Sequence, residues 1–358
     1  MQDYVKFPVY AKGALIIVGL IAAVYCLQSL QDIILPLIYA LLLAILVNPA
    51  VNYLISKRLN RVVSIFIIVI VAVLFLGGVG YLIFAQFLRM SDSYSDLSEK
   101  FTAASDLLVK SASQHLTIKE KTIYSWFSTS SSEYISNFAL GENLFIAGKV
   151  LITFTLLPVY MIMILYYKPL LLEFIRKLFR VEHHETVIDV LTKTKRIIQT
   201  YLTGLFFELI IVAILNSTGL LLLGIEYAIL IGVLGSVLNI IPYIGGIIAV
   251  LLPMTVAFVT EDNQLLPLYI LLLYVLTQFI DNNFIVPKIV ASRVQINALV
   301  SIIVVLLGSA LWGVAGMFLS IPLTAIVKII CDHIDPLKPL GYLLGNIVPV
   351  RSKFQFLS

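Results

Sequence analysis

The sequence predicts an all-α protein that crosses a membrane several times, and two observations support this fold class. Of the 358 residues, 60% are hydrophobic and only 12% are charged, whereas about 25% of the residues in a typical soluble domain are charged. The stretch from Tyr201 to Ile330 contains only eight charged side chains. A lipid bilayer is the solvent that suits apolar segments of this length.

Six apolar stretches are close to the length that a helix needs to cross the bilayer, about 20 residues. They lie at residues 12–28, 32–54, 62–87, 147–167, 201–223 and 266–286. Two further apolar blocks, 228–260 and 298–330, are longer than 30 residues, and glycine, proline and small residues interrupt each near its middle. We expect these two blocks to form broken or re-entrant helical hairpins. Two ordinary crossings with kinks are the alternative.

Basic residues in the loops predict the orientation, because lysine and arginine gather on the cytoplasmic side of a membrane. Three of them join the second and third spans, and seven lie in residues 168–200. Both loops, and with them the N-terminus, are therefore expected in the cytoplasm, whereas the segment 88–146, with more acidic than basic residues, is expected outside. The predicted organisation is three N-terminal spans (1–87), an extracytoplasmic amphipathic helical segment (88–146), a fourth span (147–167), cytoplasmic interfacial helices (168–200), a core with the two hairpins (201–332) and a cytoplasmic tail (333–358).

The same charge rule gives the two C-terminal blocks opposite orientations. The acidic segment 261–264 after the first block is expected outside, whereas Lys288 and Arg293, before the second block, are expected inside. Each half then holds one span and one hairpin, and a shift of 69 residues pairs Tyr243 with Trp312. This pattern favours an inverted-topology repeat, the arrangement in which secondary transporters build a site near the middle of the bilayer.

Polar groups within the apolar segments are the candidate functional site, because charged or unpaired groups are costly there. Asp281 stands near Gln278 and Asn282, and this set of oxygens could bind a cation or carry a proton. A structural role is the alternative for Asp281, as is close helix packing for the glycines and prolines. The expected substrate-binding or ion-binding residues are Asn239, Pro242, Tyr243, Gly245, Gly246, Gln278, Asp281, Asn282, Pro287, Gly308, Trp312, Gly313, Gly316 and Glu208.

Sequence motifs for catalysis or nucleotide binding are absent from the chain: it contains no HExxH, G-x-S-x-G, Walker or Rossmann glycine pattern. We therefore expect no enzyme activity, no cofactor and no metal site. The net charge of +4 comes from basic residues beside apolar spans, where positive charge sets topology. The expected partner is the lipid bilayer and not a nucleic acid.

Two stretches resemble the AI-2E (autoinducer-2 exporter) family of membrane proteins. They are YLTGLFFELIIVAILNSTGLLLLGIEYAILIGVLGSVLNIIPYIGG (Tyr201 to Gly246) and QFIDNNFIVPKIVASRVQINALVSIIVVLLGSALWGVAGMFLSIP (Gln278 to Pro322). The first has the IPYIG core, and the second has DN-x-x-x-x-P-[KR] followed by G-x-x-G. The chain departs from the family pattern at Gly246, and near Asn297, where the family often has proline. The resemblance implies a multi-pass protein of the bacterial inner membrane that forms a homo-oligomer, such as a pentamer. It also implies autoinducer-2 export or sodium/proton antiport, which occur in different members.

The residues and the resemblance together predict a secondary transporter that exports a small polar molecule similar to autoinducer-2, coupled to H⁺ or Na⁺. A Na⁺/H⁺ antiporter is one alternative. An oligomeric channel, a second alternative, would pass solute without ion coupling and would tolerate Asp281→Asn. A scaffolding membrane protein that acts through the segment 88–146, a third alternative, would show no flux.

Overall fold

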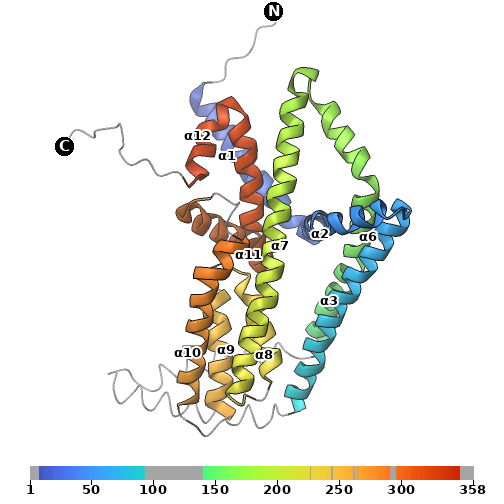
Figure 1. Cartoon of the computed structure of the whole chain (residues 1–358). Helices are drawn as coiled ribbons and strands as arrows, with labels where there is room; N and C mark the ends of the chain where they lie inside the picture. Colours follow the sequence, from blue (N-terminus) through green and yellow to red (C-terminus); the bar gives the residue numbers. More distant parts are fainter. Residues whose placement is uncertain are drawn as a thin grey trace, which may run out of the picture. The chain divides into compact units, whose positions relative to one another are not determined.

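The computed structural model describes residues 8–92, 140–225, 227–242, 245–260, 263, 265–290 and 296–346, and in these ranges it contains helices and no strand (Figure 1). The all-α prediction is confirmed. Among the described residues, six helices are long and apolar enough to cross a membrane, which confirms a multi-pass arrangement. They are Gln31–Ser56, Arg61–Tyr81, Thr155–Leu178, Val181–Leu222, Leu266–Ile289 and Ala298–His333.

The chain divides into two compact units. The first comprises Met1–Leu46, Tyr167–Gln199 and Val294–Ser358, and the second comprises Val47–Tyr166 and Thr200–Arg293. The described helices are α1 (Val9–Ser29), α2 (Gln31–Ser56), α3 (Arg61–Asp92), α6 (Leu140–Leu178), η1 (Val181–His183), α7 (His184–Leu222), α8 (Ala228–Asn239), α9 (Gly245–Thr260), α10 (Leu266–Ile280), the π-helix η2 (Asp281–Val290), α11 (Ala298–His333), η3 (Asp335–Leu337) and α12 (Lys338–Leu344).

In the second unit, α8, α9 and α10 run side by side (Figure 1). Their apolar core includes Ile231 from α8, Ala257 from α9 and Ile270 from α10, each almost fully buried. Elsewhere in this unit, Arg61 at the start of α3 donates hydrogen bonds to the carbonyls of Leu165 and Tyr166 in α6, at 2.7 and 3.0 Å. The guanidinium therefore ties the start of α3 to α6.

The first interrupted block folds into a hairpin whose arms are α8 and α9. The arms pack against each other, and the chain reverses between Asn239 and Gly245. Gly245 lies so close to the carbonyl of Leu238 that a Cβ atom there would overlap it. Glycine is therefore required where α9 begins.

The second interrupted block also folds back on itself, within α11 of the first unit. The reversal falls at Trp312 (φ −138°, ψ 21°) and Gly313 (φ 60°, ψ −138°), and the positive φ of Gly313 is a conformation that favours glycine. Gly308 lies before the turn and Gly316 after it. The two approach so closely that a Cβ atom on either would overlap the carbonyl oxygen of the other. Backbone therefore contacts backbone between the two arms.

The helices α1 and α2 hold this turn through hydrogen bonds in which backbone carbonyls accept from side chains. Trp312 Nε1 donates to the carbonyl of Leu27 at 3.0 Å. Tyr39 of α2 donates its hydroxyl to the carbonyl of Ala315 at 3.3 Å and stacks on Phe318, with ring centroids 5.9 Å apart. The helix α1 and the part of α2 up to Leu46 thus form one unit with the α11 hairpin.

The glycine contact between the arms of α11 gives a testable expectation. Gly308→Ala should lower stability by about 1–3 kcal/mol, because an added methyl group forces the arms apart. The matched control is Gly78→Ala in α3, where nothing lies within 4 Å of the added Cβ and alanine favours the helix by up to about 1 kcal/mol. Thermal unfolding in detergent measures both, and an unchanged midpoint for Gly308→Ala would contradict the close packing.

Candidate functional site

A cavity of about 980 Å³ lies in the second unit, among α7, the α8–α9 hairpin, α10 and η2. Sites for small molecules usually measure about 300–1,000 Å³ and are mostly apolar, with a few well-placed polar groups. This cavity follows that pattern. Its apolar walls include Leu205, Val250 and Met254, and a cluster of polar side chains lies at the same cavity.

Two carboxyl groups dominate the polar cluster. Asp281, at the start of η2, is 2% exposed, and Glu208 of α7 is 6% exposed. Asn239, the last residue of α8, donates its Nδ2 hydrogen to Asp281 Oδ2 at 3.1 Å. Asp281 Oδ1 has no hydrogen-bond partner among the described residues, and no described basic side chain forms an ion pair with either carboxyl.

A second and much smaller cavity, of about 10 Å³, adjoins Asp281. It has roughly the room that one water molecule requires. Asn216, Tyr274 and Thr277 contribute to its lining. Asn216 Oδ1 and the Tyr274 hydroxyl are buried and, among the described residues, have no hydrogen-bond partner. The carboxylate therefore stands between a solute-sized cavity and a small polar space.

The π-helix explains how Asp281 reaches this position. The α-helical hydrogen bonding of α10 ends at Ile280, and the next turns are wider. Near this transition the carbonyl of Phe279 accepts a hydrogen bond from the Asn283 side chain at 2.8 Å. Pro287 lies inside η2 and has no backbone N–H to donate. Such wide turns within membrane helices occur frequently at functional sites.

The structure brings seven of the residues expected from the sequence together at the large cavity: Glu208, Asn239, Pro242, Gly246, Gln278, Asp281 and Asn282. Two others lie elsewhere in the same unit. Gly245 packs on the Leu238 carbonyl, and Pro287 is exposed on η2. Tyr243 lies outside the described residues. Gly308, Trp312, Gly313 and Gly316 belong to the first unit, where they form the turn and the close contact of α11.

Sequence reasoning missed Asn216, Tyr274 and Thr277. A signal for Asn216 exists, because it follows Glu208 by eight residues and so lies on the same face of α7. Thr277 precedes Asp281 by four residues, which also places the two on one face. The spacing of polar residues within the spans would have found both.

A multi-pass helical protein with buried carboxyl groups beside a solute-sized cavity belongs to the class of membrane proteins that handle ions or small solutes. Comparison with known proteins defines the class further. Residues 14–335 match the model of the AI-2E family transporters. The chain belongs to this family.

The relatives include two Escherichia coli K12 proteins that the chain matches over most of their length. One is the "AI-2 transport protein TqsA", 24% identical over 93% of this chain and 95% of the relative. The other is the "Putative transport protein YhhT", 24% identical over 89% and 90%. A "Putative transport protein" of Borreliella burgdorferi is 31% identical over 39% of this chain. The chain spans 41% of that protein and 37% of the Bacillus subtilis "Putative transport protein YrrI".

The buried carboxyl of Asp281 gives an expectation about stability. Asp281→Asn should leave stability unchanged or raise it by up to about 2 kcal/mol. The substitution removes a buried acidic group that lacks a counter-charge, and the asparagine side chain has nearly the same shape. Asp335→Asn is the control, since Asp335 pairs at the surface with Lys338 at 2.6 Å, and such pairs contribute about 0–1 kcal/mol. Thermal unfolding in detergent compares the variants. Marked destabilisation by Asp281→Asn would show that the carboxylate serves to hold the fold.

Proposed function

We propose that this chain is a secondary transporter that exports a small polar molecule through the large cavity of the second unit. The observation that carries the proposal is the Asp281 carboxyl, which is buried beside the cavity with one oxygen unpaired among the described residues. A fold rarely retains such a group in an apolar span unless function requires it. Family membership and the name of the TqsA relative support transport of a small solute.

The chemistry of the cavity suits coupling of the solute to a proton or a small cation. A carboxyl in apolar surroundings favours its neutral, protonated form, whereas a bound cation favours the ionised form. The Asn239 amide stabilises the ionised oxygen through its hydrogen bond. Proton and cation therefore compete for the same group, and that competition is the basis of exchange across a membrane.

The Na⁺/H⁺ antiporter is the second candidate function. Asn216, Thr277 and Gln278 line the small cavity together with Asp281, and each of their side chains has an oxygen that can serve as a cation ligand. Hard cations prefer oxygen ligands of this kind. In this version the cation itself is the transported substrate and the large cavity is its access route.

We further propose that the two hairpins are re-entrant and that they descend from an inverted repeat. Their reversals lie at corresponding positions, 240–244 and 312–313, under the shift of 69 residues. Proline follows each reversal at corresponding places, Pro253 and Pro322, and both prolines are buried. We place the protein in the bacterial inner membrane as a homo-oligomer with a cytoplasmic N-terminus, in accordance with the loop charges and the family.

Flux measurements in proteoliposomes test the proposal. Vesicles that contain a pH-sensitive dye and an imposed pH gradient are given autoinducer-2 or Na⁺. If the protein is a proton-coupled transporter, autoinducer-2 collapses the gradient in the native protein, and Asp281→Asn lowers the rate by at least tenfold. Collapse driven by Na⁺ alone, and lost in the same variant, identifies the antiporter.

Two controls separate the remaining alternatives. Asp335→Asn should transport at the native rate, because that carboxyl lies at the surface of the first unit. Flux of labelled autoinducer-2 that needs no gradient and persists in Asp281→Asn would identify a channel. If neither Na⁺ nor autoinducer-2 crosses the membrane with native protein, the transporter proposal is wrong.

A further inference from the structure

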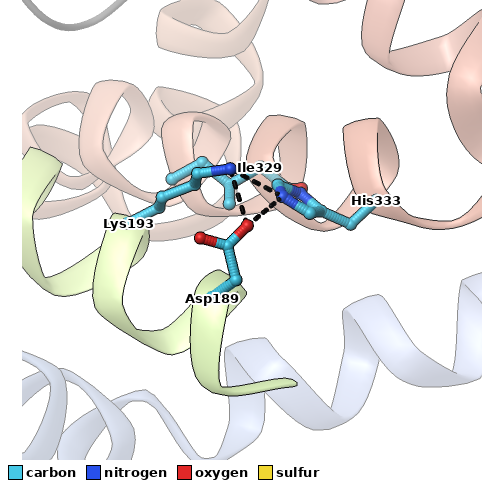
Figure 2. Close-up of polar contacts among 4 residues, drawn as sticks. All are labelled: Asp189, Lys193, Ile329 and His333. Atoms are coloured by element: carbon cyan, nitrogen blue, oxygen red, sulfur yellow. Dashed lines mark hydrogen bonds and ion pairs between the residues drawn. The ribbon is translucent and has the colours of Figure 1, made fainter. Parts of the chain in front are cut away.

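A histidine at the end of α11 contacts two oppositely charged side chains of α7, all within the first unit (Figure 2). His333 Nε2 lies 3.0 Å from Asp189 Oδ2 and 3.2 Å from Lys193 Nζ. Asp189 and Lys193 also form an ion pair with each other at 2.6 Å. One nitrogen of the ring therefore faces an anion and a cation that stand one helical turn apart.

The other ring nitrogen fixes the tautomer. His333 Nδ1 lies 2.7 Å from the backbone carbonyl of Ile329. A carbonyl oxygen can only accept a hydrogen bond, so Nδ1 must carry the hydrogen. Nε2 is then bare when the ring is neutral and carries a hydrogen when the ring is cationic.

The two α7 partners suit different states of Nε2. An unprotonated Nε2 accepts a hydrogen bond from the Lys193 ammonium. Its lone pair then faces a lone pair of the Asp189 oxygen, which is unfavourable. A protonated Nε2 donates to Asp189, whereas it faces the Lys193 ammonium as one cation facing another. Each charge state of His333 thus has one favourable and one unfavourable neighbour on α7.

We propose that His333 is a proton-binding site, separate from the transport cavity, that exchanges Lys193 for Asp189 as its partner when it takes up a proton. The ligand is a proton from water, and the cluster is open to it: the side chain of His333 is 19% exposed and those of Asp189 and Lys193 are about half exposed. Histidine is the side chain that ordinarily changes charge near neutral pH. The contact between α7 and the end of α11 therefore responds to pH.

The other charged groups at the end of α11 and directly after it are paired among themselves. On α11, Lys328 Nζ binds Asp332 Oδ2 at 2.6 Å, and after α11 the Asp335 carboxylate binds Lys338 at 2.6 Å. Glu185 and Arg196 lie about one turn to either side of the pair on α7. The hydrogen bonds that join α11 to α1 and α2 involve residues near its turn, Ala310, Trp312 and Ala315, and not its end. Asp189 and Lys193 are the two charged groups in hydrogen-bonding range of Nε2 among the described residues.

The direction of the pH effect follows from the partners. At low pH the cationic ring donates both of its hydrogens, to Ile329 and Asp189, and its charge is compensated by the carboxylate. As the pH rises and Nε2 loses its proton, the bond to Asp189 is lost and Lys193 takes its place. Removal of Asp189 should therefore make protonation of His333 harder, and removal of Lys193 should make it easier.

Nitrogen NMR of the full-length protein in lipid bilayers, with ¹⁵N-labelled histidine, tests this proposal. The chain has four histidines, and His333→Gln identifies the signals of His333. Spectra are recorded from pH 5 to pH 9, and Nε2 should lose its hydrogen as the pH rises while Nδ1 keeps its own. Asp189→Asn should move the midpoint to lower pH and Lys193→Gln to higher pH, each by about 0.2–0.7 unit, the size expected of partly exposed pairs.

Two variants of the same unit serve as matched controls. Lys195→Gln removes a nearby charge on another face of α7, and Glu173→Gln removes an acid that pairs with Arg176. Both should leave the His333 midpoint within about 0.1 unit. The proposal is overturned if Asp189→Asn and Lys193→Gln move the midpoint in the same direction, if neither moves it, or if Nε2 keeps one state throughout. Signals of the other three histidines report whether each variant is folded.

Discussion

A helix that breaks within a bilayer must give its freed backbone groups partners other than lipid, because each unpaired group there costs several kcal/mol. In the first hairpin, turn hydrogen bonds meet this requirement: the N–H groups of Ile241 and Gly245 donate to the carbonyls of Leu238 and Ile241 at 2.9 and 3.0 Å. In the second, side chains of α1 and α2 meet it, because Gln28 Nε2 and the Tyr39 hydroxyl donate to the carbonyls of Ala310 and Ala315 at 3.4 and 3.3 Å. Gly245, Gly308 and Gly316 allow the backbones of the arms to approach closely, so the interrupted blocks remain compact.

The position of the candidate site depends on the first of these breaks. Because α8 ends at Asn239, the side-chain amide at its terminus reaches Asp281, which the π-helix presents at the wall of the cavity. The carboxyl receives this one hydrogen bond among the described residues and keeps its second oxygen unpaired. A group held in this way is fixed in place yet able to accept a proton or a cation. Close packing and an unsatisfied polar atom thus occur together, as expected where function limits stability.

Much of the fold was predictable from the sequence. The length of an apolar segment indicates whether a helix can cross the bilayer, and its glycine and proline residues indicate where the helix breaks. The expected spans 32–54 and 266–286 match α2 and the α10–η2 segment, and both breaks lie where glycine and proline interrupt the blocks. The continuation of α6 beyond residue 167 to Leu178 was not expected. Charged residues mark the end of an apolar span, but a helix can continue through them. Nor does periodicity reveal which helices face each other. The juxtaposition of Glu208 with Asp281, 73 residues away, therefore required the structure.

In the transport mechanism that we propose, Asp281 is a buried carboxyl that binds and releases a proton beside the large cavity. Hydrophobic carbodiimides modify carboxyl groups that are protonated in apolar surroundings, and mass spectrometry locates the modified residue in protein embedded in liposomes. We expect modification of Asp281 that declines as the pH rises and that the transported solute or cation suppresses. Absence of modification at Asp281 from pH 5 to 9, in samples where other carboxyls react, would contradict it.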